Sequence, residues 1–269
     1  MIRDITIGQY YPVDSVIHRL DPRTKLAGTM VFLMSLFVTR SPIGYVLATL
    51  ALAVVIRASK VPFKFITRGL KAILVVLLLS VSFNIFLTEG DVLLRLGFLK
   101  VTKQGLMLAG FMGIRLIYLV LGSSLMTLTT TPTQLTDGLE RSLRFLNRFG
   151  IPVHDIAMMM SIALRFIPIL VEETDKIMKA QTARGADFDS GNIIQRAKAM
   201  IPLLVPLFVS AFRRASDLAM AMEARCYHGG EGRTKMHPLQ YERRDRRAYV
   251  LMLVYFVVMV ATRFIRLGR

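Results

Sequence analysis

The sequence predicts an all-α membrane protein with about five transmembrane helices and a cytoplasmic domain of three helices. Two observations support this fold class. The 269-residue chain has a mean hydropathy of +0.50 and 54% hydrophobic residues, which is too apolar for a soluble domain of this size. Its apolar residues also gather into five runs without charge, whereas charged residues gather between the fourth run and the fifth.

The five charge-free runs predict the membrane spans. Several of them are 14 to 17 residues long, which is shorter than the ~20 residues of a perpendicular span, so the first two can form a short hairpin. The predicted spans are Leu26–Thr39, Ser41–Ile56, Ala72–Thr88, Leu116–Thr130 with an apolar lead-in from Gly105, and Ala248–Thr262.

The distribution of basic residues predicts how the chain crosses the cell membrane. With a cytoplasmic N-terminus, 27 of the 35 Lys and Arg residues fall on the inner side and 7 on the outer side, as the positive-inside rule requires. The first 25 residues contain charges and no apolar core, so they do not resemble a cleaved secretory signal. We therefore divide the chain into a four-span bundle (1–130), a cytoplasmic domain (131–247) and a final span with the C-terminus (248–269).

The predicted spans contain no Asp, Glu or His, which disfavours an ion-coupled carrier or an intramembrane hydrolase. Arg115 is the exception among charged residues, because it lies within the fourth apolar stretch. An unpaired cation there would cost at least ~2.5–3.5 kcal/mol. Arg115 therefore either has a function of its own or faces the bundle interior and bonds to a carbonyl.

Three helices are expected in the cytoplasmic domain. The first begins with a capping box, in which Thr131 is the N-cap, Pro132 the first helical residue and Gln134 the returning partner, and it ends near Gly150. The second runs from Pro152 to Arg184, with a bend at Pro168 and Gly185 in the place of a left-handed cap. The third follows "DSGN", passes Pro202 and Pro206 and ends near Arg225.

Both long helices end on the pattern Ala-x-x-Ala-Arg, at Arg184 and at Arg225. A cation in the last turn stabilises the dipole of its own helix. An arginine at a helix tip, with small neighbours, can also enter a groove of another chain and pair with a carboxylate or with carbonyl groups there. The spacing alone leaves these two interpretations equal.

Other candidate sites in this domain have simpler explanations. Glu172, Glu173 and Asp175 lie mid-helix among lysines and are expected to form solvated pairs along the helix rather than a catalytic site. The basic run "ERRDRR" precedes the last span, where the positive-inside rule explains it without nucleic acid. Methionines at helical spacing fit core filling or an adaptable binding surface. No motif supports a membrane enzyme or a nucleic-acid binder.

Four stretches of the sequence resemble the transmembrane T component (EcfT) of energy-coupling factor transporters, in the shared form found in Gram-positive bacteria. They are "HRLDPRTKL", "LTTTPTQLTDGLE", "SIALRFIPILVEETDKIMKAQTARGADF" and "IPLLVPLFVSAFRRASDLAMAMEARCYHGGEGRTK". The resemblance implies a non-catalytic scaffold of a vitamin importer, in which two long, crossing helices of a coupling domain transmit motion. It also implies two ABC-type ATPase subunits, which bind ATP and Mg²⁺, and one vitamin-binding membrane (S) subunit. No cofactor and no nucleic acid is expected on this chain.

The resemblance also assigns the candidate site residues. The ATPase-docking residues are Ala183, Arg184, Gly185, Ala224, Arg225 and Cys226. The residues expected to contact the S subunit are Met158, Met159, Met160, Met178, Met220 and Met222. Cys226 departs from the family's glycine, and because its Cβ disfavours a left-handed cap, we expect the third helix to continue to Gly229 and Gly230. The vitamin itself is not specified by this chain.

Overall fold

The computed structural model places the chain in two compact units, each of which is considered separately. The first unit, called the bundle, comprises Gly8–Gly138 together with Leu239–Arg269. The second, called the helix-pair unit, lies between them, from Leu139 to Pro238. The structure describes residues 9–39, 41–96, 99–186, 188, 192–230, 236 and 238–264.

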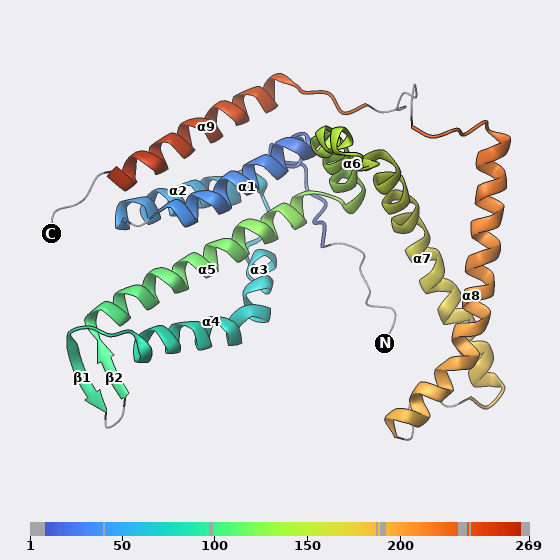
Figure 1. Ribbon diagram of the computed structural model, residues 1–269, viewed down its shortest axis with the longest axis horizontal. Helices are drawn as coiled ribbons and strands as arrows, with labels where there is room; N and C mark the ends of the chain where they lie inside the picture. The colour runs from blue at the N-terminus through green and yellow to red at the C-terminus, as the bar shows by residue number, and fades with distance from the viewer. Residues whose placement is uncertain are drawn as a thin grey trace. The chain divides into compact units, whose positions relative to one another are not determined.

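The bundle is built from the apolar runs of the sequence. Each of the five predicted spans lies within a helix, with boundaries that differ by a few residues (Figure 1). A short helix, α3, precedes the third span. The elements are α1 (Pro22–Val38), α2 (Pro42–Ser59), α3 (Phe63–Ile66), α4 (Arg68–Leu87), α5 (Lys103–Thr129), the first part of α6 (Pro132–Leu143) and α9 (Arg243–Phe264).

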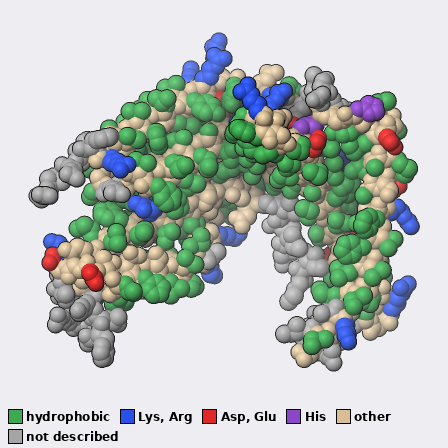
Figure 2. All heavy atoms as spheres, in the orientation of Figure 1, with side chains coloured by type: hydrophobic (Ala, Val, Ile, Leu, Met, Phe, Trp, Pro, Cys, Tyr) green, Lys and Arg blue, Asp and Glu red, His purple; other side chains and the backbone are tan. Residues whose placement is uncertain are grey.

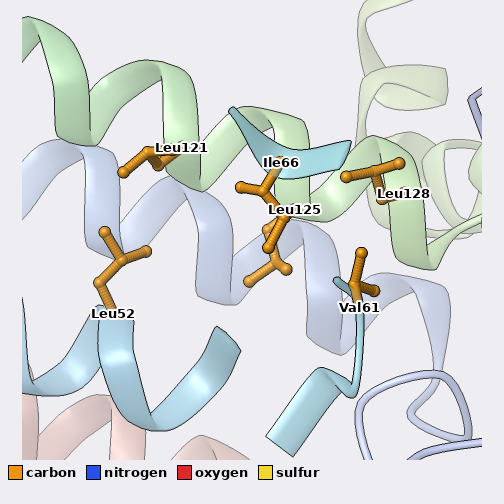
Figure 3. Packing of buried hydrophobic residues seen from close by; sticks show 6 residues of the cluster. All are labelled: Leu52, Val61, Ile66, Leu121, Leu125 and Leu128. Carbon is orange, nitrogen blue, oxygen red and sulfur yellow. The ribbon is translucent and has the colours of Figure 1, made fainter. Parts of the chain in front are cut away.

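Helix α5 lies at the centre of the bundle, where it contacts α1, α2, α3 and α4. The close-up in Figure 3 shows the main core cluster, to which α2, α3, α5 and the α2–α3 connection contribute side chains. Gly122 of α5 permits a close approach to α1, because a Cβ there would lie 2.9 Å from the Phe32 ring. The core residues in Figure 3 are Leu52, Val61, Ile66, Leu121, Leu125 and Leu128.

The outer surface of the bundle is apolar. On α4, the side chains of Val75, Leu79 and Phe83 are each more than half exposed. A surface of this kind is unfavourable in water and suited to lipid, so the bundle is a membrane domain.

Length and composition alone select a different set of candidate spans. Helices α2, α5 and α7 and residues Lys198–Ala224 of α8 are long and apolar enough to cross a membrane. The bent pair Phe63–Lys71 and Ile73–Leu87, which covers α3 and α4, makes a fifth candidate. Helix α1 has only 17 residues, and α9 opens on five charged residues. The cytoplasmic placement of α7 and α8 stays a prediction from the charges in their second halves.

A β-hairpin connects α4 to α5, which the sequence did not predict. Strands β1 (Val92–Leu96) and β2 (Leu99–Thr102) pair antiparallel. The base of the hairpin is closed by Asp91 and Gln104, because the backbone N–H of Asp91 donates to Oε1 of Gln104 at 2.8 Å. The hairpin joins the adjacent ends of α4 and α5 (Figure 1).

Buried polar contacts join the starts of α1 and α9. The carboxylate of Asp245, which is 2% exposed, accepts hydrogen bonds from the backbone N–H groups of Asp21 and Glu242, both at 2.9 Å. The side chain of Asp21 in turn accepts from the guanidinium of Arg23 at 2.8 Å. The "DPR" of the sequence therefore has a structural role: it fixes two helix ends against each other.

Hydrogen bonds in the same region also connect the start of α1 to the end of α5. The ammonium of Lys25 donates to the carbonyls of His18 and Thr129, at 2.9 and 2.8 Å. The imidazole of His18 lies between the hydroxyl of Ser15 and the carbonyl of Tyr11. Burial lowers the pKa of His18, and the nearby Lys25 cation lowers it further. His18 therefore favours its neutral form in the folded bundle.

The capping box that opens α6 is confirmed. The backbone N–H of Thr131 donates to Oε1 of Gln134, and the backbone N–H of Gln134 donates to Oγ1 of Thr131, both at 3.3 Å. The α-helix ends at Leu143 rather than near Gly150, and a 3₁₀ helix, η2 (Arg144–Phe149), fills the interval. Gly150 follows in the left-handed conformation, with φ of 78°.

The helix-pair unit contains η2 and the two long helices, α7 (Val153–Ala183) and α8 (Ile193–Ala224). Both begin and end within one or two residues of the predicted positions. They pack against each other, as Figure 1 shows.

Candidate functional site

The two predicted docking motifs lie at the C-terminal ends of α7 and α8. The first tip is Ala183, Arg184 and Gly185, and the second tip is Ala224, Arg225 and Cys226. All six residues are exposed. Among the described residues, neither Arg184 nor Arg225 has a hydrogen-bond or ion-pair partner for its guanidinium. Both guanidinium groups therefore belong to exposed residues at the two helix ends.

The first tip is held by a Schellman cap, the pattern in which two backbone N–H groups beyond the helix bond back to its last turn. The N–H of Ala186 donates to the carbonyl of Gln181, and that of Gly185 to the carbonyl of Thr182, both at 3.0 Å. Gly185 has φ of 90°, in the left-handed region. The prediction that Gly185 caps α7 is confirmed.

The second tip repeats this cap, and our expectation for Cys226 was wrong. The N–H of Tyr227 donates to the carbonyl of Met222 at 3.0 Å, and that of Cys226 to Glu223 at 2.8 Å. Cys226 is left-handed, with φ of 54°, so α8 ends at Ala224 and does not continue to Gly229. A left-handed residue with a Cβ costs roughly 1–2 kcal/mol. We attribute its adoption to the two cap hydrogen bonds and the small, unbranched side chain.

Helices α7 and α8 run antiparallel. Near the end of α7, the side-chain amide of Gln181 donates to the carbonyl of Pro202, early in α8, at 3.4 Å. Near the start of α7, His154 lies against Gly230, beyond the end of α8. The two arginine tips therefore lie at opposite ends of the pair.

A polar link joins the middles of the two helices. The carboxylate of Glu173 on α7 accepts hydrogen bonds from the hydroxyl of Ser210 and, at 2.8 Å, from the guanidinium of Arg214, both on α8. The sequence assigned Glu173 to solvated pairs along its own helix, and that prediction was wrong. Ser210 and Arg214 are four residues apart and share one helix face, which allows both to reach the same carboxylate.

The segments between this link and the tips are regular helix. Arg184 lies eleven positions after Glu173, and Arg225 lies eleven positions after Arg214. At 1.5 Å per residue, each tip lies about 17 Å beyond the link along its helix. The prolines of both helices, Pro168 in α7 and Pro202 and Pro206 in α8, all precede the link. We call the segments from the link to the tips, residues 173–184 and 214–225, the arms. Neither arm contains proline, the residue that most often kinks a helix.

An apolar groove of about 300 Å³ lies along the packed pair, on the side of the link that contains the second tip. Its lining residues are Ile162, Phe166 and Leu170 from α7, and Ala211, Arg214, Ala215, Leu218, Ala219 and Met222 from α8. In Figure 2, hydrophobic side chains cover much of the visible surface of both helices.

The methionines predicted to contact the S subunit lie on this surface rather than in a core. Met159, Met160 and Met220 are 58%, 44% and 60% exposed. Met158, Met178 and Met222 are partly exposed. Core filling within this chain therefore does not explain Met159, Met160 and Met220, and the contact of all six methionines with an S subunit stays a prediction.

Arg115 has partners inside the bundle. Its Nε donates to the hydroxyl of Tyr45 at 3.2 Å, and one terminal nitrogen donates to the carbonyl of Thr39, beyond the end of α1, at 3.4 Å. This is the second of the two interpretations, in which the cation bonds to a carbonyl. In the part of the chain that the structure describes, no three His, Cys, Asp or Glu side chains are placed to hold a metal ion.

Comparisons with known proteins agree with this architecture. Residues 14–236 match the family model CbiQ, described as cobalt transport protein. The chain is 51% identical over 265 residues to the energy-coupling factor transporter transmembrane protein EcfT of Clostridium kluyveri, covering 98% of each chain. It is 51% identical to the protein of that name from Thermosediminibacter oceani, over 98% of this chain and 100% of that one. It is 49% identical to EcfT of Bacillus subtilis, over 94% of this chain and 96% of that one.

The apolar helices and these relatives together define a multi-pass transport protein of the cell membrane. The family match covers more than half of the chain, and the relatives match nearly all of it. The chain belongs to the CbiQ family and is an EcfT-type transmembrane component of an energy-coupling factor transporter. The resemblance noted in the sequence is thereby confirmed.

Proposed function

We propose that this chain is the scaffold that couples two ABC-type ATPase subunits to an exchangeable, vitamin-binding membrane subunit. One observation carries the proposal: an antiparallel helix pair presents the same capped, exposed arginine at each of its two ends. Two matching tips at opposite ends suit two matching partners. A helix-stabilising role alone does not require both guanidinium groups to lack partners among the residues that the structure describes.

Each tip would dock into a groove of one ATPase subunit. The planar guanidinium of Arg184 or Arg225 can form paired hydrogen bonds with a carboxylate or with carbonyl groups there. The neighbouring Ala183 and Ala224 are small enough to let the helix end approach closely. The left-handed caps turn the chain away immediately after each arginine.

The arms beyond the Glu173–Arg214 link would act as levers. When ATP binding closes the two ATPase subunits, the docked tips move relative to each other, and the regular arms carry that movement to the link. The link holds α7 and α8 together, so the pair tilts as a unit. The apolar surface that contains Met159 and Met220 would then tilt or release the S subunit that it binds.

The chain itself would hold neither ATP nor Mg²⁺ and would catalyse no reaction. Its sequence lacks the phosphate-binding loop that nucleotide hydrolysis requires. ATP and Mg²⁺ would be bound by the ATPase subunits, and the vitamin by the S subunit.

The docking role is tested with the Arg184→Ala, Arg225→Ala double variant in the intact transporter. Truncating a buried, hydrogen-bonded charge at an interface costs about 2–5 kcal/mol, so each ATPase contact should weaken by roughly 30-fold or more. ATPase co-purification and vitamin uptake should both fall. Arg213→Ala is the matched control, because Arg213 is an exposed arginine of α8 distant from both tips.

Wild-type ATPase association in the double variant, at matched membrane expression, would contradict docking by these tips. Arg184→Lys with Arg225→Lys adds a second criterion. Lysine keeps the charge but loses the planar fork, so this variant should fall between the alanine variant and the wild type. If it matches the wild type, the contact needs only a positive charge.

A further inference from the structure

The turn between α6 and α7 exposes aromatic side chains beside arginines. Phe145 and Phe149 are 61% and 77% exposed, and residues 141–152 contain three arginines and no Asp or Glu. We call residues 141–149 the basic–aromatic segment, and we propose that it binds the membrane surface through anionic phospholipid head groups. The proposal does not depend on whether the arginine tips dock to ATPases.

The exposure of these phenylalanines is built into the local structure. The N–H groups of Gly150 and Ile151 donate back to the carbonyls of Asn147 and Leu146, at 3.1 and 3.4 Å. The side chain of Asn147 also accepts from the N–H of Val153 at 3.3 Å and caps the start of α7. These bonds define the backbone on both sides of Phe149, so its ring is presented to the surroundings by an ordered turn.

The composition of the segment fits a lipid surface. Elements that lie in the membrane interface place Phe or Leu among the acyl chains and Lys or Arg among the head groups. Arg141, Arg144 and Arg148 supply the positive charge here. A basic cluster beside a membrane helix is attracted to anionic lipid, because the surface potential of that lipid is negative. Over α6, Figure 2 shows basic side chains next to hydrophobic ones.

The position of α6 favours lipid over a soluble acidic partner. Helix α6 begins three residues after α5 ends, and a Cβ on Gly138 would lie 3.0 Å from Pro22, the first residue of α1. The first half of α6 thus runs along the ends of two membrane helices. From Gly138 to Phe149 the chain can advance only about 20 Å, at the rise of α and 3₁₀ helices. The segment therefore stays within reach of the head-group layer.

The absence of tryptophan from this chain makes a direct test possible. Phe149→Trp introduces a single indole at the segment. The full-length variant is reconstituted into phosphatidylcholine vesicles that contain either no phosphatidylglycerol or about 40 mol% of it, a fraction that gives the vesicle surface a negative potential. Lipids brominated near the head group report contact with the membrane, and aqueous iodide reports contact with water.

We expect brominated lipid to quench the indole at least twofold in the vesicles with phosphatidylglycerol, and clearly less in phosphatidylcholine alone. Adding Arg144→Gln and Arg148→Gln should make lipid quenching of the indole equal in the two kinds of vesicle. Lys179→Trp, in the charged half of α7, is the control and should be quenched by iodide only. If Phe149→Trp does not fold, Phe145→Trp replaces it.

Three results would overturn the proposal. Iodide quenching without lipid quenching would place the segment in water. Equal lipid quenching with and without phosphatidylglycerol would show that the arginines do not recognise anionic lipid. Protection from iodide that requires added S subunit, with no lipid quenching, would make the segment a protein-binding surface instead.

Discussion

The left-handed conformation of Cys226 gives a quantitative prediction. Cys226→Gly removes a Cβ from a residue with φ of 54°, which relieves roughly 1–2 kcal/mol of conformational strain. The greater freedom of glycine in the frayed helix end offsets part of this gain. A net stabilisation of about 1 kcal/mol should therefore slow the opening-limited exchange of the last-turn amides about fivefold. Vitamin uptake should stay close to that of the wild type.

Hydrogen exchange followed by mass spectrometry measures this effect in the peptide that contains the Cys226 and Tyr227 amides, which donate the cap hydrogen bonds. Cys226→Ser is the control for loss of the thiol, because serine keeps a Cβ and should leave exchange nearly unchanged. Gly185→Ala is the reciprocal variant. The Cβ of alanine at position 185 would enter open space, so only the positive φ of this residue disfavours the substitution. Hydrogen exchange of the amides at the first tip should therefore quicken. Unchanged or faster exchange in Cys226→Gly would refute the assigned cap.

Three further predictions concern the bundle and the link. Asp245→Ala removes the acceptor of one buried backbone N–H group, that of Asp21, and of one part-buried N–H group, that of Glu242, so the free energy of unfolding should fall by about 2–4 kcal/mol. Asp245→Asn keeps one acceptor oxygen and should lose less stability, and an unchanged Tm in the alanine variant would contradict this role. Arg214→Ala should lower vitamin uptake while ATPase co-purification persists, because the tips remain intact. The swapped pair, Glu173→Arg with Arg214→Glu, should restore part of the uptake. If Arg214→Ala abolished both uptake and co-purification, the link would not act separately from the tips. Because the folded-state pKa of His18 is lowered, its stabilising contribution is present above the ordinary pKa of 6.5 and is lost as the pH falls through the folded value. Hydrogen exchange of the Tyr11 amide, corrected for its intrinsic pH dependence, should quicken below about pH 6.5 in the wild type but not in His18→Gln. If the two proteins showed the same dependence of exchange on pH, His18 would be excluded as the cause.

The helices were predictable because their signals are local. Charge-free runs located α1, α2, α4, α5 and α9, and the Thr131–Gln134 capping box and Gly185 located helix ends in the following region. These features depend on residues within one or two helical turns. The β-hairpin escaped prediction because strand β1, "VLLRL", lacks a clear alternation of apolar and polar residues.

The site was predictable as a pattern but not as a geometry. The sequence identified Arg184 and Arg225 and their repeated spacing. It did not identify the Glu173–Arg214 link, because 41 residues separate the partners and only the antiparallel packing of two helices brings them together. The prediction for Cys226 was wrong because it considered only the cost of the left-handed conformation for a residue with a Cβ. It did not consider the cap hydrogen bonds that offset this cost.

The repeated arginine spacing and the antiparallel packing together imply a local twofold relation within a single chain. The shift of 41 residues that superposes Arg184 on Arg225 also superposes Glu173 on Arg214, and these two residues contact each other. The axis of the relation therefore passes through the link, and a rotation about it exchanges the two tips. A pair of ATPase subunits related by a twofold axis could meet both tips in equivalent positions, although this chain is present only once. If both tips dock as proposed, a single asymmetric chain would therefore offer two equivalent contacts to a symmetric pair of partners.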